Sequence, residues 1–493
     1  MAIFTPGLSA IEKEIANAAD YPTYREASLA HDALTGADEW KNEDVSQHYD
    51  YRLIRKRVER MQAARKLQDV YGLMSIIHEG LHGNLGNIAN PALLGQCRIG
   101  TKNLIQTFID EVITALNTIY EADESLVDFY EKKRFFEETT YAFGQSCLML
   151  SGGAGLGIFH AGVVKSLNQQ NLLPGVISGA SAGAIIAALI GTRKQSELEA
   201  CLAPEFILEK FRYWRHWSGF GKKSLFDSRA LENTLIELFD IMTFDEAFAL
   251  SGKHINVSVS PADLHQQSRV LNAKTSPRAV ITQAVRASTA VPVFFSPVQL
   301  KAKNLQGDIV PYIPNRRFVD GSMMADLPYK QLSRLYGVNH SIVSQTNPLA
   351  IPFVPANRSE ETSITGLTFR HVRQLAKSNS VFAFDVLEKW VNHRGTKLAI
   401  HKVRSIIDQQ YVGNINILPQ RQLRSLTQIM ANPTLESVTN LISDGERATW
   451  EHIDNIERNT KISETLRRLL AKLKEREARV SGHATSSART EST

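Results

Sequence analysis

The 493-residue chain has few cysteines, no long apolar run and little excess charge of either sign. Its three cysteines, Cys97, Cys147 and Cys201, cannot all pair with one another, which argues against a disulfide framework and favours a reducing compartment. Lys and Arg number 56 against 51 Asp and Glu, a far smaller excess than a nucleic-acid-binding surface requires. Because 43% of the residues are hydrophobic, the chain can bury a large core. We therefore expect a globular protein of enzyme size with no nucleic-acid partner.

Export and membrane-spanning signals are also missing. Residues 1–7 contain no basic stretch followed by an apolar one, so no secretory signal is predicted. The most apolar stretch, 176–191, is shorter than the ~20 residues that a membrane-spanning helix needs, and it contains two serines. It is better interpreted as a buried strand, turn and helix. We expect a cytoplasmic protein that can still bind a membrane or lipid-droplet surface peripherally.

What the sequence does contain is a change of character at Ser146. Before it the patterns are helical, most clearly in 102–120, where apolar residues recur at i, i+3, i+4 and i+7. After it, an apolar strand, a Gly-rich turn, a helix, a second strand and another helix form a βαβ unit, which implies a parallel sheet covered by helices. The other expected elements are helices at 51–67, 206–240 and 277–285, and strands at 255–259, 318–319 and 341–343.

Gly179-x-Ser181-x-Gly183 matches the G-x-S-x-G pattern of a nucleophile elbow. There the nucleophile lies on a sharp strand-to-helix turn, and small neighbours let the backbone pass without steric conflict. The turn would also place Ser181 at a helix N-terminus, where free N–H groups stabilise negative charge. The alternative is the start of a closely packed helix with no chemical role.

A second Gly-rich turn, 152–157, follows the first strand. The G-x-G-x-x-G dinucleotide fingerprint does not fit, because Ala154 takes the middle position, and no P-loop lysine follows. Backbone N–H groups directed at a tetrahedral intermediate are therefore favoured over a nucleotide site. Both turns follow parallel strands, so they are expected at one edge of the sheet.

Ser181 needs a base, and Asp320 is the candidate because it follows an apolar strand and precedes Gly321. One solution is a triad in the order Ser181, Asp320, His340. A shorter one is a dyad in which Asp320 contacts Ser181 directly. Burial would raise the pKa of this carboxyl and bring it closer to useful base strength at neutral pH. The alternative for Asp320-Gly321 is a simple turn.

The stretch from His78 to His82 is a formal H-E-x-x-H zinc motif. A zinc site needs both histidines on one face of a stable helix, whereas Gly80 and Gly83 weaken a helix here. We therefore predict surface or capping histidines and no metal. His160, just after the 152–157 turn, is expected to be buried or to orient that turn.

Together these motifs resemble the patatin-like phospholipase family. The residues that carry the resemblance are Leu150 to Ala154, Gly157, His160, Gly162 to Val164, Gly179-x-Ser181-x-Gly183 and Asp320-Gly321. Members are serine acyl hydrolases with a Ser–Asp dyad and no catalytic histidine. The resemblance implies that Ser181 is the nucleophile and Asp320 the base, with no cofactor. It also implies that oxyanion N–H groups come from Gly152, Gly153 and Ala154.

The sequence is similar to one branch in particular, the triacylglycerol lipases of yeast and plant seeds, which carry a helical DUF3336-like region before the patatin domain. The stretches that look like this branch are Asn84 to Asn90, Gly100 to Lys102, Phe135-Phe136, Asp320 to Pro328 and Val338 to Pro348. The implied fold is α/β: a patatin-like three-layer α/β/α domain with a mostly parallel sheet, after an all-α region and before further helices. The predicted parts are helical region 1–145, catalytic domain 146–350, helical part 351–480 and disordered tail 481–493.

The expected function is hydrolysis of the carboxylic esters of lipids, with triacylglycerol as the favoured substrate and an acyl-Ser181 intermediate. The same dyad allows a phospholipase A, or an acyltransferase that passes the acyl group to an alcohol such as a lysophospholipid. A further alternative is a non-catalytic lipid-binding protein with the same fold.

One segment, 366–410, combines basic and aromatic residues. It holds eight Lys and Arg against three Asp and Glu, a net charge of +5 that equals that of the whole chain. Its aromatic residues include Phe369, Phe382, Phe384 and Trp390. Such a segment can lie on anionic lipid, or it can pack on the catalytic domain with a solvated basic face.

Overall fold

The computed structural model describes residues 7–211, 228–263, 266–292, 294–348, 350–351, 354, 412–419 and 433–490. The chain forms two compact units. Unit 1 is Met1–Gln145 with Asp454–Thr493, and unit 2 is Ser146–Ile453. The basic segment 366–410 lies outside the described residues.

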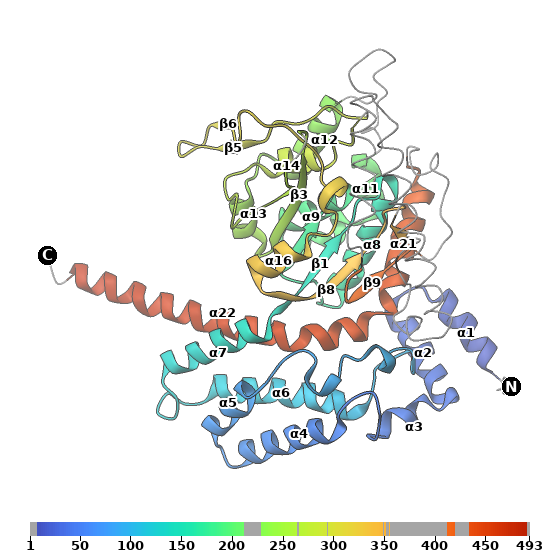
Figure 1. Ribbon diagram of the computed structural model, residues 1–493, viewed down its shortest axis with the longest axis vertical. Helices are drawn as coiled ribbons and strands as arrows, with labels where there is room; N and C mark the ends of the chain where they lie inside the picture. The colour runs from blue at the N-terminus through green and yellow to red at the C-terminus, as the bar shows by residue number, and fades with distance from the viewer. Residues whose placement is uncertain are drawn as a thin grey trace, which may run out of the picture. The chain divides into compact units, whose positions relative to one another are not determined.

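Unit 1 is helical in its described residues. Its α-helices are α1 (Leu8–Asn17), α2 (Tyr21–Thr35), α3 (Ala37–Asn42), α4 (Tyr51–Lys66), α5 (Val70–His78), α6 (Asn103–Glu121), α7 (Phe129–Phe143) and nearly all of α22 (Ile453–Thr490). Helices α4 and α6 agree with the predicted ranges to within one residue at each end. The core of unit 1 joins α4, α6 and α7 to α22, which buries Ile462, Leu466, Leu469 and Leu473 (Figure 1). The end of the chain therefore completes the core formed by its beginning.

Four helices of unit 1 begin directly after an aspartate that caps them. The side chain of each accepts a backbone N–H from the first turn, which would otherwise have no partner. Each such cap stabilises its helix by about 1 kcal/mol. The capping residues are Asp20 for α2, Asp50 for α4, Asp69 for α5 and Asp128 for α7.

Unit 2 is built around a seven-stranded sheet with the order β4-β3-β2-β1-β8-β9, in which β7 also pairs with β3. The strands are β1 (Gln145–Leu150), β2 (Val176–Gly179), β3 (His254–Pro261), β4 (Arg269–Asn272), β7 (Phe318–Asp320), β8 (Val338–Ser344) and β9 (Ile415–Ile417). The pairs β1–β2, β2–β3 and β8–β9 are parallel, whereas β4 and β7 run antiparallel to β3. The prediction of a mostly parallel sheet is therefore confirmed.

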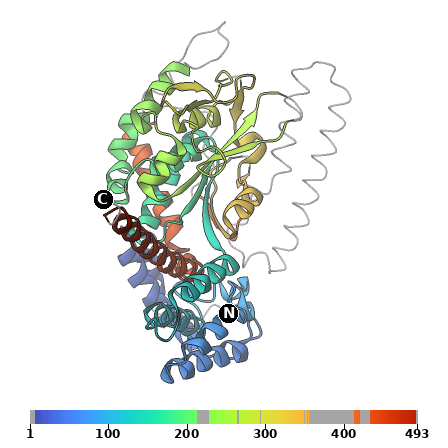
Figure 2. The same cartoon turned by 90° about the vertical axis from the view of Figure 1, so that its left-hand side faces the viewer.

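Helices cover both faces of this sheet and make it a three-layer α/β/α domain. On one face, α16 (Tyr329–Tyr336) packs Leu332 against Cys147 and Met149 of β1. Because side chains alternate along a strand, the residues between them face the opposite layer, which contains α8 (Phe159–Gln169), α9 (Ala182–Gly191) and α21 (Leu435–Trp450). Figure 2 shows the sheet between the orange α16 and the green helices. The remaining helices of unit 2 are α10 (Leu198–Cys201), α11 (Pro204–Phe211), α12 (Ser228–Phe239), α13 (Phe244–Ser251), α14 (Ile281–Ser288) and α15 (Ser322–Ala325).

Helices α8 and α21 cross at backbone contact. A Cβ atom added to Gly162 would overlap the carbonyl oxygen of Ile442, and one added to Gly445 would overlap that of Phe159. Each helix therefore presents a glycine where the other passes. This close crossing holds α8, which follows the 152–157 turn, against α21 within the same helical layer.

The structure differs from the sequence-based expectation in several short elements. The stretch 351–480 is not wholly helical, because its Ile415–Ile417 forms β9 at the edge of the sheet. A segment of three residues is too short to show a hydrophobic periodicity, so only its pairing with β8 makes it a strand. The hairpin of β5 (Lys301–Lys303) and β6 (Ile309–Pro311) was not predicted either. Helix α14 begins at Ile281 rather than 277, since Ala279 and Val280 form β-bridges.

The boundaries in the C-terminal part of the chain also differ from the predicted ones. Unit 2 extends to Ile453, and the chain beyond it belongs to unit 1. Helix α22 continues to Thr490 and so enters the stretch predicted to be a disordered tail. None of the helices in the described part of the chain combines the length and the apolar character that crossing a membrane requires.

Candidate active site

Ser181 lies on a strained turn between β2 and α9. Its backbone angles, φ 51° and ψ −122°, fall where residues with a side chain are rarely found. The turn is possible because its neighbours have no side chain: a Cβ on Gly179 would overlap the carbonyl oxygen of Gly183, and one on Gly183 would overlap that of Leu150. The predicted strand, turn and helix are therefore present, with Ser181 directly before the first residue of α9.

A second serine fixes the backbone of this turn. The N–H of Ser181 donates to Oγ of Ser288, at 2.9 Å, and Ser288 is the fully buried last residue of α14. The contact holds the Ser181 peptide in its unusual conformation and does not involve its hydroxyl.

Asp320 is the last residue of β7 and is almost fully buried, with 1% exposure. Its pairing with Val259 of β3 places it at the sheet, and Gly321 lies so close to the carbonyl oxygen of Ser258 that no side chain would fit. The Asp-Gly pair is thus a close backbone approach inside the sheet rather than a simple surface turn. Strands β2 and β7 pair with the same side of β3, opposite β4: Gly179 ends β2 beside Val257, and Asp320 pairs with Val259 two residues further along. The structure thus brings Ser181 and Asp320 together.

The two oxygens of the Asp320 carboxyl have different surroundings. Oδ1 accepts the N–H of Ser322 at 2.8 Å and its hydroxyl at 2.7 Å. Oδ2 is buried and accepts no hydrogen bond from the described residues. Ser181 is close enough to influence the carboxyl without completing a hydrogen bond, a common state for catalytic pairs that tighten when substrate binds.

Burial raises the pKa of Asp320 to about 6, against smaller opposite effects of the Ser181 and Ser322 hydroxyls and the Ser322 N–H. At neutral pH the carboxyl is therefore mostly charged, yet close to the pH at which it can take up a proton. Such a group can act as a general base and then as a general acid.

The 152–157 turn lies directly against this pair. A Cβ on Gly152 would be 2.8 Å from the Cβ of Ser322 and 3.2 Å from that of Ser181, so only glycine fits between them. The expected oxyanion role of its N–H is not met by this geometry, because the N–H donates to Oδ1 of Asp326 at 2.7 Å. Among the described residues, the N–H groups of Gly153 and Ala154 donate to no protein acceptor.

The side chain of His160 contacts the residue that precedes the 152–157 turn. The ring is fully buried, with Nε2 2.9 Å from the carbonyl oxygen of Ser151 and Nδ1 2.7 Å from Oγ of Ser344. Burial lowers the pKa of His160 to about 4, so the ring is neutral at physiological pH. Its contact with Ser151 orients the residue that precedes the turn. His160 is therefore both buried and in a position to orient the turn, the two roles predicted from the sequence.

Two further groups at this edge were not predicted as site residues. The N–H of Ala182 begins α9 and has no acceptor among the described residues, and its place directly after the nucleophile was the available signal. Asp326 is buried beside Gly152, and nothing local in the sequence distinguishes it from a surface carboxylate.

Other candidates lie elsewhere. His340 contacts Ser146, at the start of β1, whereas the Gly-rich turn follows the end of that strand, so the triad with His340 is wrong. Helix α5 ends at His78, which places the second half of the H-E-x-x-H motif outside a helix. Its Glu79 carboxylate is paired with Arg57 and Arg60.

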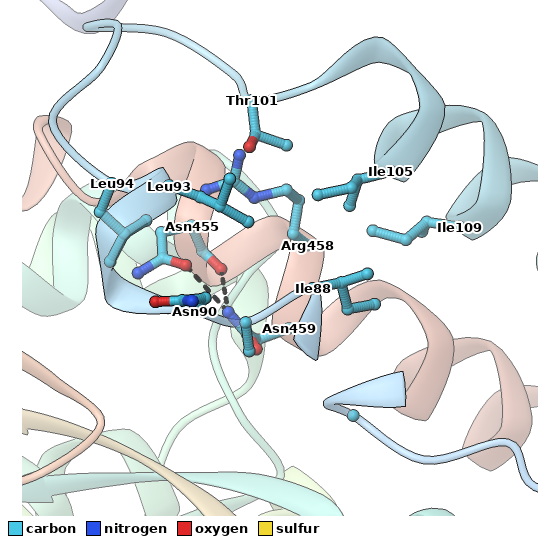
Figure 3. A pocket seen from close by; sticks show the side chains of 12 residues that line it. Ile88, Asn90, Leu93, Leu94, Thr101, Ile105, Ile109, Asn455, Arg458 and Asn459 are labelled. Carbon is cyan, nitrogen blue, oxygen red and sulfur yellow. Dashed lines mark hydrogen bonds between the residues drawn. The ribbon is translucent and has the colours of Figure 1, made fainter. Parts of the chain in front are cut away.

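Two cavities among the described residues lie apart from Ser181. One in unit 1, between α22 and the 83–109 stretch, has a volume of about 30 Å³, room for only about two waters (Figure 3). Arg458, Asn455 and Asn459 of α22 line it. A larger one in unit 2, of about 580 Å³, is lined by Met149, Met324 and their neighbours but not by Ser181 or Asp320.

Comparison with known proteins gives matches over both units. Residues 148–333 match the family model described as patatin-like phospholipase, and residues 8–141 match a domain of unknown function, DUF3336. The chain is 34% identical over 463 residues to triacylglycerol lipase 4 of Saccharomyces cerevisiae, covering 90% of this chain and 50% of that protein. It is 30% identical over 466 residues to triacylglycerol lipase ptl2 of Schizosaccharomyces pombe, covering 90% and 73%.

A plant protein is similar to the same extent. The identity to triacylglycerol lipase SDP1L of Arabidopsis thaliana is 32% over 462 residues, covering 89% of this chain and 56% of the relative. The chain thus spans about half of the length of the budding-yeast and plant relatives and nearly three quarters of that of the fission-yeast relative.

Proposed function

Because this chain belongs to the patatin-like phospholipase family, we propose that it is a serine acyl hydrolase that cleaves the carboxylic esters of lipids, with triacylglycerol as its substrate. The observation that carries the proposal is the buried carboxyl of Asp320, with a pKa of about 6, beside a serine on a strained elbow. A purely lipid-binding protein has no use for either feature, since both are costly to the fold.

In the first half of the proposed reaction, Asp320 accepts the proton of the Ser181 hydroxyl as Oγ attacks the ester carbonyl carbon. The negative charge that develops on the carbonyl oxygen is stabilised by the N–H groups of Gly153 and Ala154. Asp320 then returns its proton to the departing alcohol, and an acyl-Ser181 remains. Ala182, at the N-terminus of α9, offers a third N–H close to the same oxygen.

In the second half, water replaces the alcohol. Asp320 accepts a proton from the water, the hydroxide attacks the acyl carbon, and the proton returns to Oγ of Ser181 as the fatty acid is released. His160 takes no part in proton transfer, because burial lowers its pKa to about 4 and makes it a weak base, and because its two nitrogens contact Ser344 and Ser151 rather than Ser181.

Ser322 gives a test of Asp320 as the base. The Ser322→Ala variant removes the hydroxyl that favours the charged carboxylate and keeps the backbone N–H. The pKa of Asp320 should rise, and the acidic limb of the kcat/KM profile should move up by about one pH unit with little change in the plateau. Ser178→Ala is the control and should leave the limb in place. An unmoved limb in Ser322→Ala would mean that another group controls it.

We place the enzyme in the cytoplasm, at the surface of a membrane or lipid droplet. The support is the net charge of +5 in 366–410, interleaved with aromatic residues, which suits an anionic lipid surface. An insoluble ester can be reached only at such an interface.

A lipid panel tests the substrate. We expect wild-type protein to release fatty acid from triacylglycerol droplets faster than from diacylglycerol, monoacylglycerol or phospholipid, and faster still when the droplets carry anionic phospholipid at low salt. Preference for phospholipid would make it a phospholipase A. Appearance of the acyl group on added lysophospholipid, in place of free fatty acid, would make it an acyltransferase.

A further inference from the structure

We propose that Asp326 is a positioning residue: its carboxylate holds the Gly152 N–H and thereby keeps the next two N–H groups, those of Gly153 and Ala154, free and aligned for the oxyanion. The inference rests on the proposed function and deepens it. Asp326 acts through Gly152 and is not itself expected to contact the substrate.

The contacts of Asp326 are those of a loop anchor. Its side chain is 1% exposed, Oδ1 accepts the N–H of Gly152 at 2.7 Å, and Oδ2 accepts from Nδ2 of Asn347 at 3.2 Å. A buried carboxylate with such partners is costly to a protein, because it has lost its hydration. Burial and the nearby Asp320 raise the pKa of Asp326 to about 7, against the opposite effects of Gly152 and Asn347.

The other supports of the turn hold a different side of it. His160 contacts the carbonyl oxygen of Ser151, and the N–H of Thr346 donates to Oγ of Ser151 at 2.7 Å. Oγ1 of Thr346 lies 3.4 Å from the carbonyl oxygen of Gly152. These groups fix carbonyl oxygens and a side chain, whereas Asp326 takes the N–H of Gly152. The Gly152 peptide is therefore held at both ends, which sets the direction of the peptides that follow.

The backbone after Gly152 needs such support. Ala154 has φ 48°, a left-handed conformation that is strained for a residue with a side chain. Strain of this kind persists only where the surroundings determine the conformation. Released from Asp326, the Gly152 N–H would be a free donor beside Ser181, and the turn could relax to a geometry in which its N–H groups no longer converge.

One short segment would therefore position both halves of the catalytic machinery. Asp320 ends β7, α15 occupies Ser322–Ala325, and Asp326 follows at once. Ser322 donates to Asp320 and also packs on Gly152, so the seven residues from Asp320 to Asp326 connect the base, the turn and its anchor.

The test compares three variants on a soluble short-chain p-nitrophenyl ester, with kcat expressed per site titrated by a fluorophosphonate. Asp326→Ala should lower kcat by about 10–100-fold with KM nearly unchanged, somewhat less than the loss of an oxyanion donor itself. Asp326→Asn should recover most of that loss, because its carbonyl oxygen can still accept the Gly152 N–H. Asp326→Glu keeps the charge but displaces the oxygen, and should stay impaired.

The outcomes separate this inference from the proposed function. If Ser181→Ala keeps its activity in the same assay, the proposed function is wrong. If Ser181→Ala is inactive but Asp326→Ala matches wild type per titrated site, or Asp326→Asn is no better than Asp326→Ala, the role of Asp326 is wrong. Should Asp326→Ala fail to fold, the order of Asp326→Asn above Asp326→Glu decides, and the reverse order would overturn the inference.

Discussion

Replacing Ser181 with alanine should lower lipid-ester hydrolysis by at least about 10³-fold and leave the fold intact. The hydroxyl supplies the atom that forms the acyl-enzyme, and no neighbouring group can substitute for Oγ at the end of the elbow. The backbone contact from the Ser181 N–H to Ser288 does not depend on the side chain, so the turn should persist in the variant. Fatty acid release from triacylglycerol droplets, together with loss of fluorophosphonate labelling, measures the effect.

Ser178 provides a matched control for this variant. It lies three residues earlier, in β2, and its buried Oγ has no hydrogen-bond partner among the described residues. Ser178→Ala removes the same kind of atom from the strand that leads into the elbow, and should leave hydrolysis and labelling near wild-type levels. Substantial activity in Ser181→Ala, with Ser178→Ala unchanged, would exclude Ser181 as the nucleophile.

The nucleophile elbow could be predicted because everything that creates it is local. Gly179 and Gly183 flank Ser181 within five residues, and an apolar strand and helix adjoin them. The same holds for the amphipathic helix α6, whose apolar spacing fixes its range. Short-range patterns of this kind predict the structure correctly because the conformation depends on neighbouring residues, and the tertiary contacts agree with it.

The features that were missed depend on distant parts of the chain. Asp326 meets Gly152 across 174 residues, and no local pattern shows that its carboxylate is buried. The family resemblance implied an oxyanion role for the N–H of Gly152, and only the structure reveals that Asp326 accepts this N–H. Strand β9 exists only as a partner of β8, and α22 finds its core among helices near the opposite end of the chain.

The second large effect is expected for Asp320→Asn, which should lower hydrolysis by about 10³-fold or more. The amide keeps the shape and the acceptor oxygen for Ser322 but cannot take the proton of Ser181. Asp263→Asn, at an exposed carboxyl two residues beyond the end of β3, is the control and should retain full activity. Activity of Asp320→Asn above about a tenth of wild type would exclude this carboxyl as the base.

The same variant should gain stability, and the gain should depend on pH. The pKa of Asp320 is about 6 in the folded protein and about 4 in an unfolded chain. Well below pH 4 both states hold the proton, so no charge is buried and Asp320 adds no pH dependence to the free energy of unfolding. As the pH rises from 4 to 6, the unfolded chain releases its proton first, so the free energy of unfolding falls and then stays constant above 6.

Asparagine has no charge to bury and escapes this loss. At pH 8, Asp320→Asn should therefore exceed wild type in its free energy of unfolding by up to ~3 kcal/mol, and the difference should vanish near pH 4. Paired denaturation curves at pH 4.5 and pH 8 measure it, because other carboxyl groups contribute equally to both proteins. A variant that is inactive, and more stable only at the higher pH, would show that the fold gives up stability to keep an ionised base beside Ser181. If the free energy of unfolding of the variant at pH 8 is equal to or lower than that of wild type, the buried charge of Asp320 does not destabilise the folded protein.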